Sequence, residues 1–180
     1  MRRVVLSCLT VLLASWANAQ VPTSGNVFFG YSFERTGSIG GANVNLNGWN
    51  ASAEGKVLPW VGLVADFDSH YGSTPVACVV VPSGCSGLGN ISEHNFLFGP
   101  RVSFSAGKIR PFAEALFGAG HIKTDFVGSN TSFATALGGG IDVKIIRPLA
   151  WRLQGDYVQT RFFGSTQNNV RLSTGIVFKF

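Results

Sequence analysis

Charged side chains recur at alternate positions of several otherwise apolar segments of this sequence. Glu114, for example, lies between Ala113 and Ala115, with the two-residue period of a strand whose faces differ. Acids and bases on this charged face are nearly balanced, and buried charges persist only when they are paired and hydrogen bonded. We therefore predict an interior charge network, with a proton or ion path along the same face as the alternative. Its members are Glu54, Asp66, Arg101, Arg110, Glu114, Asp142, Arg152, Asp156 and Arg171.

Histidine offers few further sites for chemistry. His70 follows Asp66 and Asp68, and His94 follows Glu93, so that either histidine could belong to an acid–base pair. Ser92 also precedes His94 and would supply a His/Ser pair. The three histidines, at positions 70, 94 and 121, lack the spacing of zinc ligands. We expect exposed loop histidines, and no catalytic, metal or cofactor site.

The first 19 residues have the order of a secretory signal peptide. A basic start is followed by an apolar run over 4–14 and by Ala17-Asn18-Ala19, after which we predict cleavage. Residues 1–19 are then a signal peptide, and residues 20–180 form one domain. Loss of the leader removes Cys8 and leaves Cys78 and Cys85, which predict one local disulfide in an oxidising compartment. Two free thiols are the alternative.

The composition is unusual for a soluble protein. Charged residues make up 13% of the chain, about half the usual share of roughly 25%, and the mean hydropathy is +0.25. Beyond the leader, no apolar run approaches the roughly 18 residues of a membrane-spanning helix. The net charge of +5 includes Arg2 and Arg3 of the leader, and the remaining cations are scattered along the sequence. We therefore expect no basic patch and no nucleic-acid partner.

Eight segments alternate in the manner of strands, and short and long connections alternate between them. The segments are 27–34, 47–57, 60–71, 95–104, 109–121, 133–143, 149–157 and 170–180. Two residues disturb the pattern. Phe28 interrupts the first alternation, and Pro100 lacks the N–H that a central strand needs, which predicts a bulge or a local break. The longest predicted loop covers residues 71–93.

The segregation of the two faces decides the environment of the sheet. A soluble eight-stranded barrel hides its apolar face inside, but here the opposite face is too charged to remain in contact with lipid or to form a dry core. The charged face must then be the lumen. In lipid, a β-structure spans only if it closes and leaves no unpaired edge. We predict an all-β fold: a closed antiparallel up-and-down transmembrane β-barrel of eight strands, with a lumen filled by side chains.

The whole segment 20–180 resembles the OmpA/Opa-like outer-membrane β-barrel family. The resemblance rests on the alternating end of the chain, which includes Phe178 and Phe180, and on the segments 96–101, 110–114 and 151–157. The last residues look like the signal that the outer-membrane assembly machinery recognises. The resemblance implies export by the general secretory pathway, outer-membrane lipid and the assembly machinery as partners, and a monomer. The family's periplasmic wall-binding domain is not expected, because the chain stops at Phe180.

The same resemblance implies a role in membrane integrity, adhesion or narrow conductance. We expect a structural or adhesin-like protein, whose outside loops are the place for an extracellular ligand, with a narrow porin-like channel as the alternative. A lipid A-modifying enzyme is the rival class. Lipid A deacylases and omptin-type proteases are the enzymes with small outer-membrane barrels. The His-x-Ser-Asn element of the deacylases is absent, and the chain is short for the ten-stranded barrel of the proteases. We therefore expect no enzymatic activity.

Overall fold

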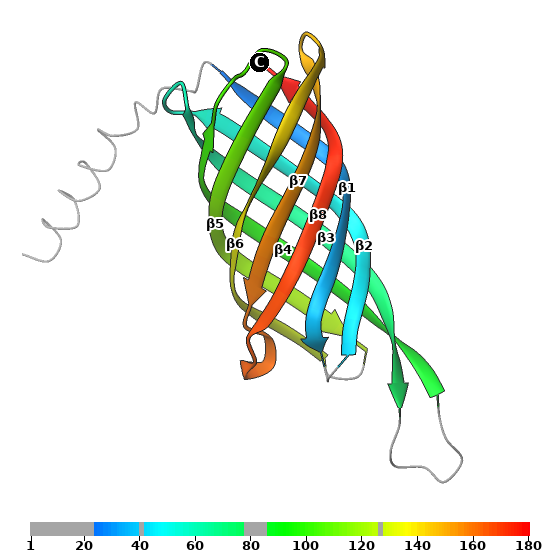
Figure 1. Ribbon diagram of the computed structural model, residues 1–180. Coiled ribbons are helices and arrows are strands. Elements are labelled where there is room, and N and C mark those ends of the chain that lie inside the picture. Colours follow the sequence, from blue (N-terminus) through cyan, green and yellow to red (C-terminus); the bar gives the residue numbers. More distant parts are fainter. Residues whose placement is uncertain (1–23, 40–41, 78–85, 126–127) are drawn as a thin grey trace, which may run out of the picture.

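The computed structural model describes residues 24–39, 42–77, 86–125 and 128–180. They form a closed barrel in which each strand is antiparallel to its neighbours and β8 pairs with β1 (Figure 1). The strands are β1 (Gly25–Ile39), β2 (Ala42–Lys56), β3 (Val61–Ala77), β4 (Ser86–Ser103), β5 (Ile109–Thr124), β6 (Gly128–Ile146), β7 (Leu149–Thr160) and β8 (Gln167–Lys179). The predicted fold class is confirmed. Within the described ranges, no helix is long and apolar enough to cross a membrane.

The alternation of the sequence is the alternation of the two barrel faces. Leu137 on β6 is 67% exposed on the outside, whereas Ala136 beside it is buried. The large side chains that face outward form an apolar belt, and the lumen contains the polar ones. Phe28, which interrupts the predicted pattern, faces the lumen and is fully buried. Its ring lies 5.1 Å from the guanidinium carbon of Arg152, which explains an aromatic residue on the charged face.

The two ends of the barrel differ. One end carries the tight turns around 57–60, 104–108 and 147–148 and also the C-terminus, and we call it the short-turn end (Figure 1). At the opposite, hairpin end, β3 and β4 extend beyond the other strands as a paired hairpin (Figure 1). Cys78, Cys85 and the leader 1–19 lie outside the described residues.

The strands are longer than their alternation predicts, and the predicted 71–93 loop is wrong over much of its length. β3 continues to Ala77 and β4 begins at Ser86, with a continuous register from Val61↔Val102 to Ala77↔Ser86. Backbone pairing needs no alternation of side chains, so the ladder continues where the alternation has ended. The alternation marks only the part of each strand that crosses the apolar belt.

Pro100 breaks one ladder locally without a bulge. The pairs Phe98↔Phe117 and Arg101↔Glu114 keep one register on either side of it, but the two intervening residues of β4 have no assigned partners on β5. On the other side, Pro100 stays in register with Leu63 of β3. The missing N–H therefore removes pairing on one side only.

Two glycines allow β8 to close against β1. Gly30 and Gly175 are direct partners, and a Cβ on Gly175 would lie 2.4 Å from the Cα of Gly30. A side chain at either position would push the closing strands apart. The connection from β7 to β8 contains a short 3-10 turn, Phe162–Gly164, which places Phe162 inside the hairpin end of the barrel.

Candidate functional site

The structure places all nine predicted network residues on the lumen side of the barrel. In the half near the short-turn end, Glu54 of β2 accepts bonds from arginines on β4 and β5. Arg101 donates from Nη1 to Glu54 at 3.2 Å and from Nε to Glu114 at 2.6 Å. Arg110 donates to the other Glu54 oxygen at 3.1 Å, and Lys56 Nζ lies 2.9 Å from the same oxygen. One carboxylate thus joins β2 to β4 and β5.

Arg152 and Asp142 form a separate buried pair on adjacent strands. Arg152 donates from Nε and Nη2 to the two carboxylate oxygens of Asp142, at 2.7 and 3.2 Å. This is the two-pronged geometry that makes arginine–carboxylate pairs strong. The same guanidinium lies 4.6 Å from the ring centroid of Phe112, so the pair is packed as well as hydrogen bonded.

Arg171 of β8 spans the middle of the lumen. It donates from Nε to Asp156 of β7 at 3.0 Å and from Nη1 to Asp66 of β3 at 2.8 Å. Nη1 also contacts Asp68. Arg171 is fully buried, and β3 and β8 are not neighbours in the barrel. Its guanidinium therefore ties opposite walls of the lumen together.

A third group, nearer the hairpin end, is absent from the predicted network. It contains Glu34, Asp68, His70, Glu93, Asn95 and Asn169, all with no exposed surface. The signal for it was available in the sequence: Asp68 and His70 continue the inward parity of Asp66, and Glu93 continues that of Asn95. Asp68 and Asn95 lie on the inner face of predicted strands, whereas His70 lies at the end of a predicted strand and Glu93 falls in the predicted 71–93 loop.

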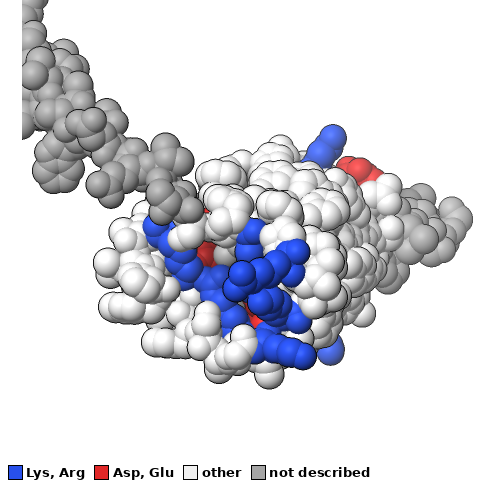
Figure 2. All heavy atoms as spheres, turned by 90° about the horizontal axis from the view of Figure 1, so that it is seen from above, with Lys and Arg blue, Asp and Glu red and all other residues white. Residues whose placement is uncertain are grey.

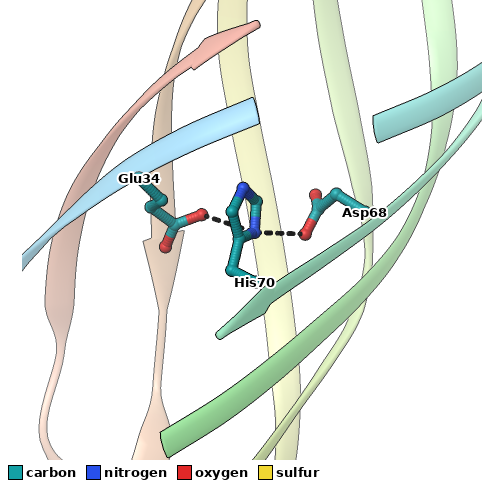
Figure 3. A group of neighbouring side chains, drawn as sticks. All are labelled: Glu34, Asp68 and His70. Atoms are coloured by element: carbon teal, nitrogen blue, oxygen red, sulfur yellow. Dashed lines mark hydrogen bonds and ion pairs between the residues drawn. The ribbon is translucent and has the colours of Figure 1, made fainter. Parts of the chain in front are cut away.

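The expectation of exposed loop histidines is wrong for His70. Its side chain is completely buried, and its Nδ1 lies 3.1 Å from Asp68 and 3.5 Å from Glu34 (Figure 3). Because β3 continues to Ala77, His70 lies within a strand, and its side chain faces the lumen. The other predicted pair separates instead: Glu93 faces the lumen, whereas His94 faces outward and contacts the Ser69 hydroxyl at 2.8 Å.

Charge in the lumen is unevenly distributed along the barrel. At the short-turn end, cations from separate turns gather around one hollowed mouth (Figure 2). They line two adjoining hollows of about 380 and 590 Å³: Lys56, Lys108, Arg110, Lys144, Arg147 and Lys179. The expectation that no basic patch forms is wrong, because turns far apart in sequence meet at this rim. Carboxylates predominate in the other half.

An apolar layer covers the carboxylate-rich half of the lumen. It is a cluster of buried side chains from β2, β4, β5 and the β7–β8 connection: Val44, Leu46, Ile91, Ile122 and Phe162. Large side chains fill the barrel between this layer and the short-turn end, and three arginines are among the largest fully buried residues. The arrangement excludes water from the charged groups, which strengthens their attraction and also makes any unpaired charge costly.

Comparison with known proteins places this fold. No protein-family profile matches the sequence, and no curated protein matches it significantly. Among solved structures, Neisserial surface protein A is 14% identical over 87% of this chain and 97% of its own, with a TM-score of 0.67. OprG of Pseudomonas aeruginosa is 9% identical, with coverages of 89% and 97% and a TM-score of 0.60.

Ail, the attachment invasion locus protein of Yersinia pestis, is 17% identical in its complex with the heparin analogue sucrose octasulfate. The match covers 86% of this chain and 98% of Ail, with a TM-score of 0.58. At these identities the likeness is one of fold. The chain is therefore an eight-stranded barrel of the small outer-membrane type, which confirms at the level of the fold its resemblance to the OmpA/Opa-like barrels.

Proposed function

We propose that this protein is an outer-membrane barrel with a closed, non-conducting lumen and a structural and surface-interaction role. The observation that carries the proposal is Arg171, which bridges β8 to carboxylates on β3 and β7 through the centre of the lumen. An eight-stranded barrel is just wide enough for its side chains to fill, so a guanidinium in this place occupies the route that a solute would take.

The location in the outer membrane is supported by the outer face and by the solved neighbours. The belt of exposed apolar side chains suits lipid. Trp60 immediately precedes β3 and Tyr71 lies past its middle, so these two exposed rings are separated along the barrel, as interfacial aromatic residues are. We include in the proposal export by the general secretory pathway and insertion by the assembly machinery through Phe178 and Phe180. The proposal also includes a monomer, which closure supports because a closed barrel leaves no strand edge to pair with another chain.

The surface-interaction part of the proposal concerns the β3–β4 hairpin, which projects beyond the other strands (Figure 1). Such a projection is the part of the molecule most accessible to a ligand outside the membrane. Because Ail was solved with a heparin analogue, an immobilised sulfated polysaccharide is a suitable first probe. Cells that display the wild-type chain should be retained more than cells whose hairpin is shortened across 75–88, and equal retention would contradict this part.

The closed lumen is tested by conductance. Refolded mature protein should migrate faster on a gel before boiling than after, and should give no discrete steps in a planar bilayer. Steady steps from the fast-migrating form would favour the narrow-channel alternative and refute the proposal. A non-enzymatic role predicts an unchanged lipid A acylation pattern with and without the protein, whereas loss of an acyl chain would identify a deacylase.

A further inference from the structure

Three side chains in the hairpin half of the lumen direct one polar atom each toward a common point. The atoms are Glu34 Oε2, Asp68 Oδ1 and His70 Nδ1, and all lie within 4.8 Å of one another (Figure 3). His70 Nδ1 is 3.1 Å from the Asp68 oxygen and 3.5 Å from the Glu34 oxygen. Ligands at about 2.0–2.1 Å from a tetrahedral metal ion are about 3.3–3.4 Å apart. The two shorter separations bracket that value.

The remaining polar atom of each side chain is held by a different partner. The second carboxylate oxygen of Glu34 accepts from the Asn169 amide at 2.7 Å, and that of Asp68 contacts Arg171. His70 Nε2 lies 2.9 Å from the Ser32 hydroxyl, which in turn lies 2.9 Å from the Ser173 hydroxyl. Such outer partners fix the orientation of metal ligands, and a histidine ligand uses its other ring N–H in this way.

The protonation state of His70 depends on its two neighbours. Nδ1 faces the carboxylate oxygens, and Nε2 faces the Ser32 hydroxyl, which can donate or accept. If Nε2 donates, the lone pair of Nδ1 points at two carboxylate oxygens, which repel it, and a cation between the three atoms removes the repulsion. If Nδ1 carries a proton, in the neutral tautomer or in the imidazolium, it donates to Asp68, so a bound metal and a protonated Nδ1 are the two arrangements to be distinguished.

The carboxylates around the site outnumber the cations that contact them. Five are buried in this half of the lumen: Glu34, Asp66, Asp68, Glu93 and Asp156. Arg171 pairs with the three aspartates. Glu34 Oε2 and Glu93 Oε2 are fully buried and accept no hydrogen bond. An unpaired ionised carboxylate in a closed interior is strongly destabilising, so it takes up a proton or binds a cation, and a divalent cation would neutralise two carboxylates.

We propose that Glu34, Asp68 and His70 bind a divalent transition-metal cation, with Zn²⁺ as the closest match to one imidazole and two carboxylates. The fourth position is left for water or for Glu93, whose carboxylate shares the Asn95 amide with Asp68. The ligands come from β1 and β3, which are separated by β2, so the ion joins strands that share no ladder. Because the apolar layer covers this half of the lumen, we expect the ion to be taken up while the barrel folds.

The test uses mature chain without a histidine tag, refolded with ZnCl₂ and freed of unbound metal by gel filtration. Wild type and the matched control His94→Gln should retain about one zinc per barrel, and His70→Gln and Glu34→Gln close to none. The mobility shift on unboiled gels shows which variants have folded. Zinc should also raise the temperature at which the shift is lost in wild type and not in His70→Gln.

Three results would overturn the proposal. Wild type could retain no zinc, which would mean that His70 Nδ1 is protonated and donates to Asp68. His70→Gln could retain as much zinc as wild type, which would mean that metal binds elsewhere. If the variants fail to fold, wild type refolded with Co²⁺ decides the matter: intense visible bands of a low-coordinate site are expected, and the weak spectrum of the aqueous ion would refute the site.

Discussion

Replacement of Arg171 by methionine should remove the central tie of the lumen while keeping most of the side-chain volume. Asp66, Asp68 and Asp156 would then lose their shared guanidinium in an interior that has no exposed surface at Asp66 or Asp68. Loss of one partner from a buried ion pair costs about 3–5 kcal/mol. We expect a loss of at least this size in the free energy of unfolding, because three carboxylates are affected. The folding equilibrium should shift by roughly two to four orders of magnitude.

The assay is urea unfolding of the mature protein in lipid vesicles, followed by tryptophan fluorescence. The matched control is Arg35→Met, because Arg35 is an exposed arginine on the outer side of β1, and its loss should cost less than about 1 kcal/mol. Adding Asp156→Asn to Arg171→Met should recover part of the loss, since one unpaired charge is removed. If Arg171→Met stays within about 1 kcal/mol of the control, the lumen is wet enough to solvate the carboxylates, and the argument from burial fails.

Three further substitutions test closure, the lipid face and the apolar layer. Gly175→Val should abolish the fast-migrating gel form, because a Cβ at this position already lies 2.3 Å from the Phe29 carbonyl oxygen; Gly155→Ala, where the nearest atom is 3.4 Å away, should retain the form. Leu137→Arg should cost about 2–4 kcal/mol in vesicle unfolding, since it places a charge in lipid, and a negligible cost would contradict the assigned outer face. Phe162→Ala should cost about 3–5 kcal/mol through the cavity it leaves, without conductance in a planar bilayer, because Arg171 still blocks the lumen; discrete steps would show that the apolar layer is the seal.

The part of the fold that crosses the apolar belt was predictable because lipid imposes alternation on it. There, each side chain faces either lipid or a narrow lumen, and the two environments select opposite residue types. Phe28 shows the limit of the rule. It faces the lumen because the ring covers the guanidinium of Arg152, a contact between residues 124 positions apart that no local pattern contains.

The hairpin half of the lumen was not predictable by the same means. His70 lies at the end of one alternating segment and Glu93 outside the next, so both resemble loop residues, although their backbone remains paired. The basic mouth was missed for a different reason. Lys56 and Lys144 lie near the ends of β2 and β6 and Lys108 lies in the β4–β5 turn, and only closure of the barrel brings these segments to one rim.

The continuous pairing of β3 with β4 gives this barrel a rigid spacer. β4 has 18 residues, which at about 3.3 Å each and a tilt of about 40° cover roughly 45 Å along the barrel axis, whereas the apolar band of such barrels is about 25 Å tall. The excess carries the paired ladder of β3 and β4 well beyond the lipid. A ligand that binds the end of this ladder meets a surface at a fixed height, and its binding need not immobilise the strands that carry it.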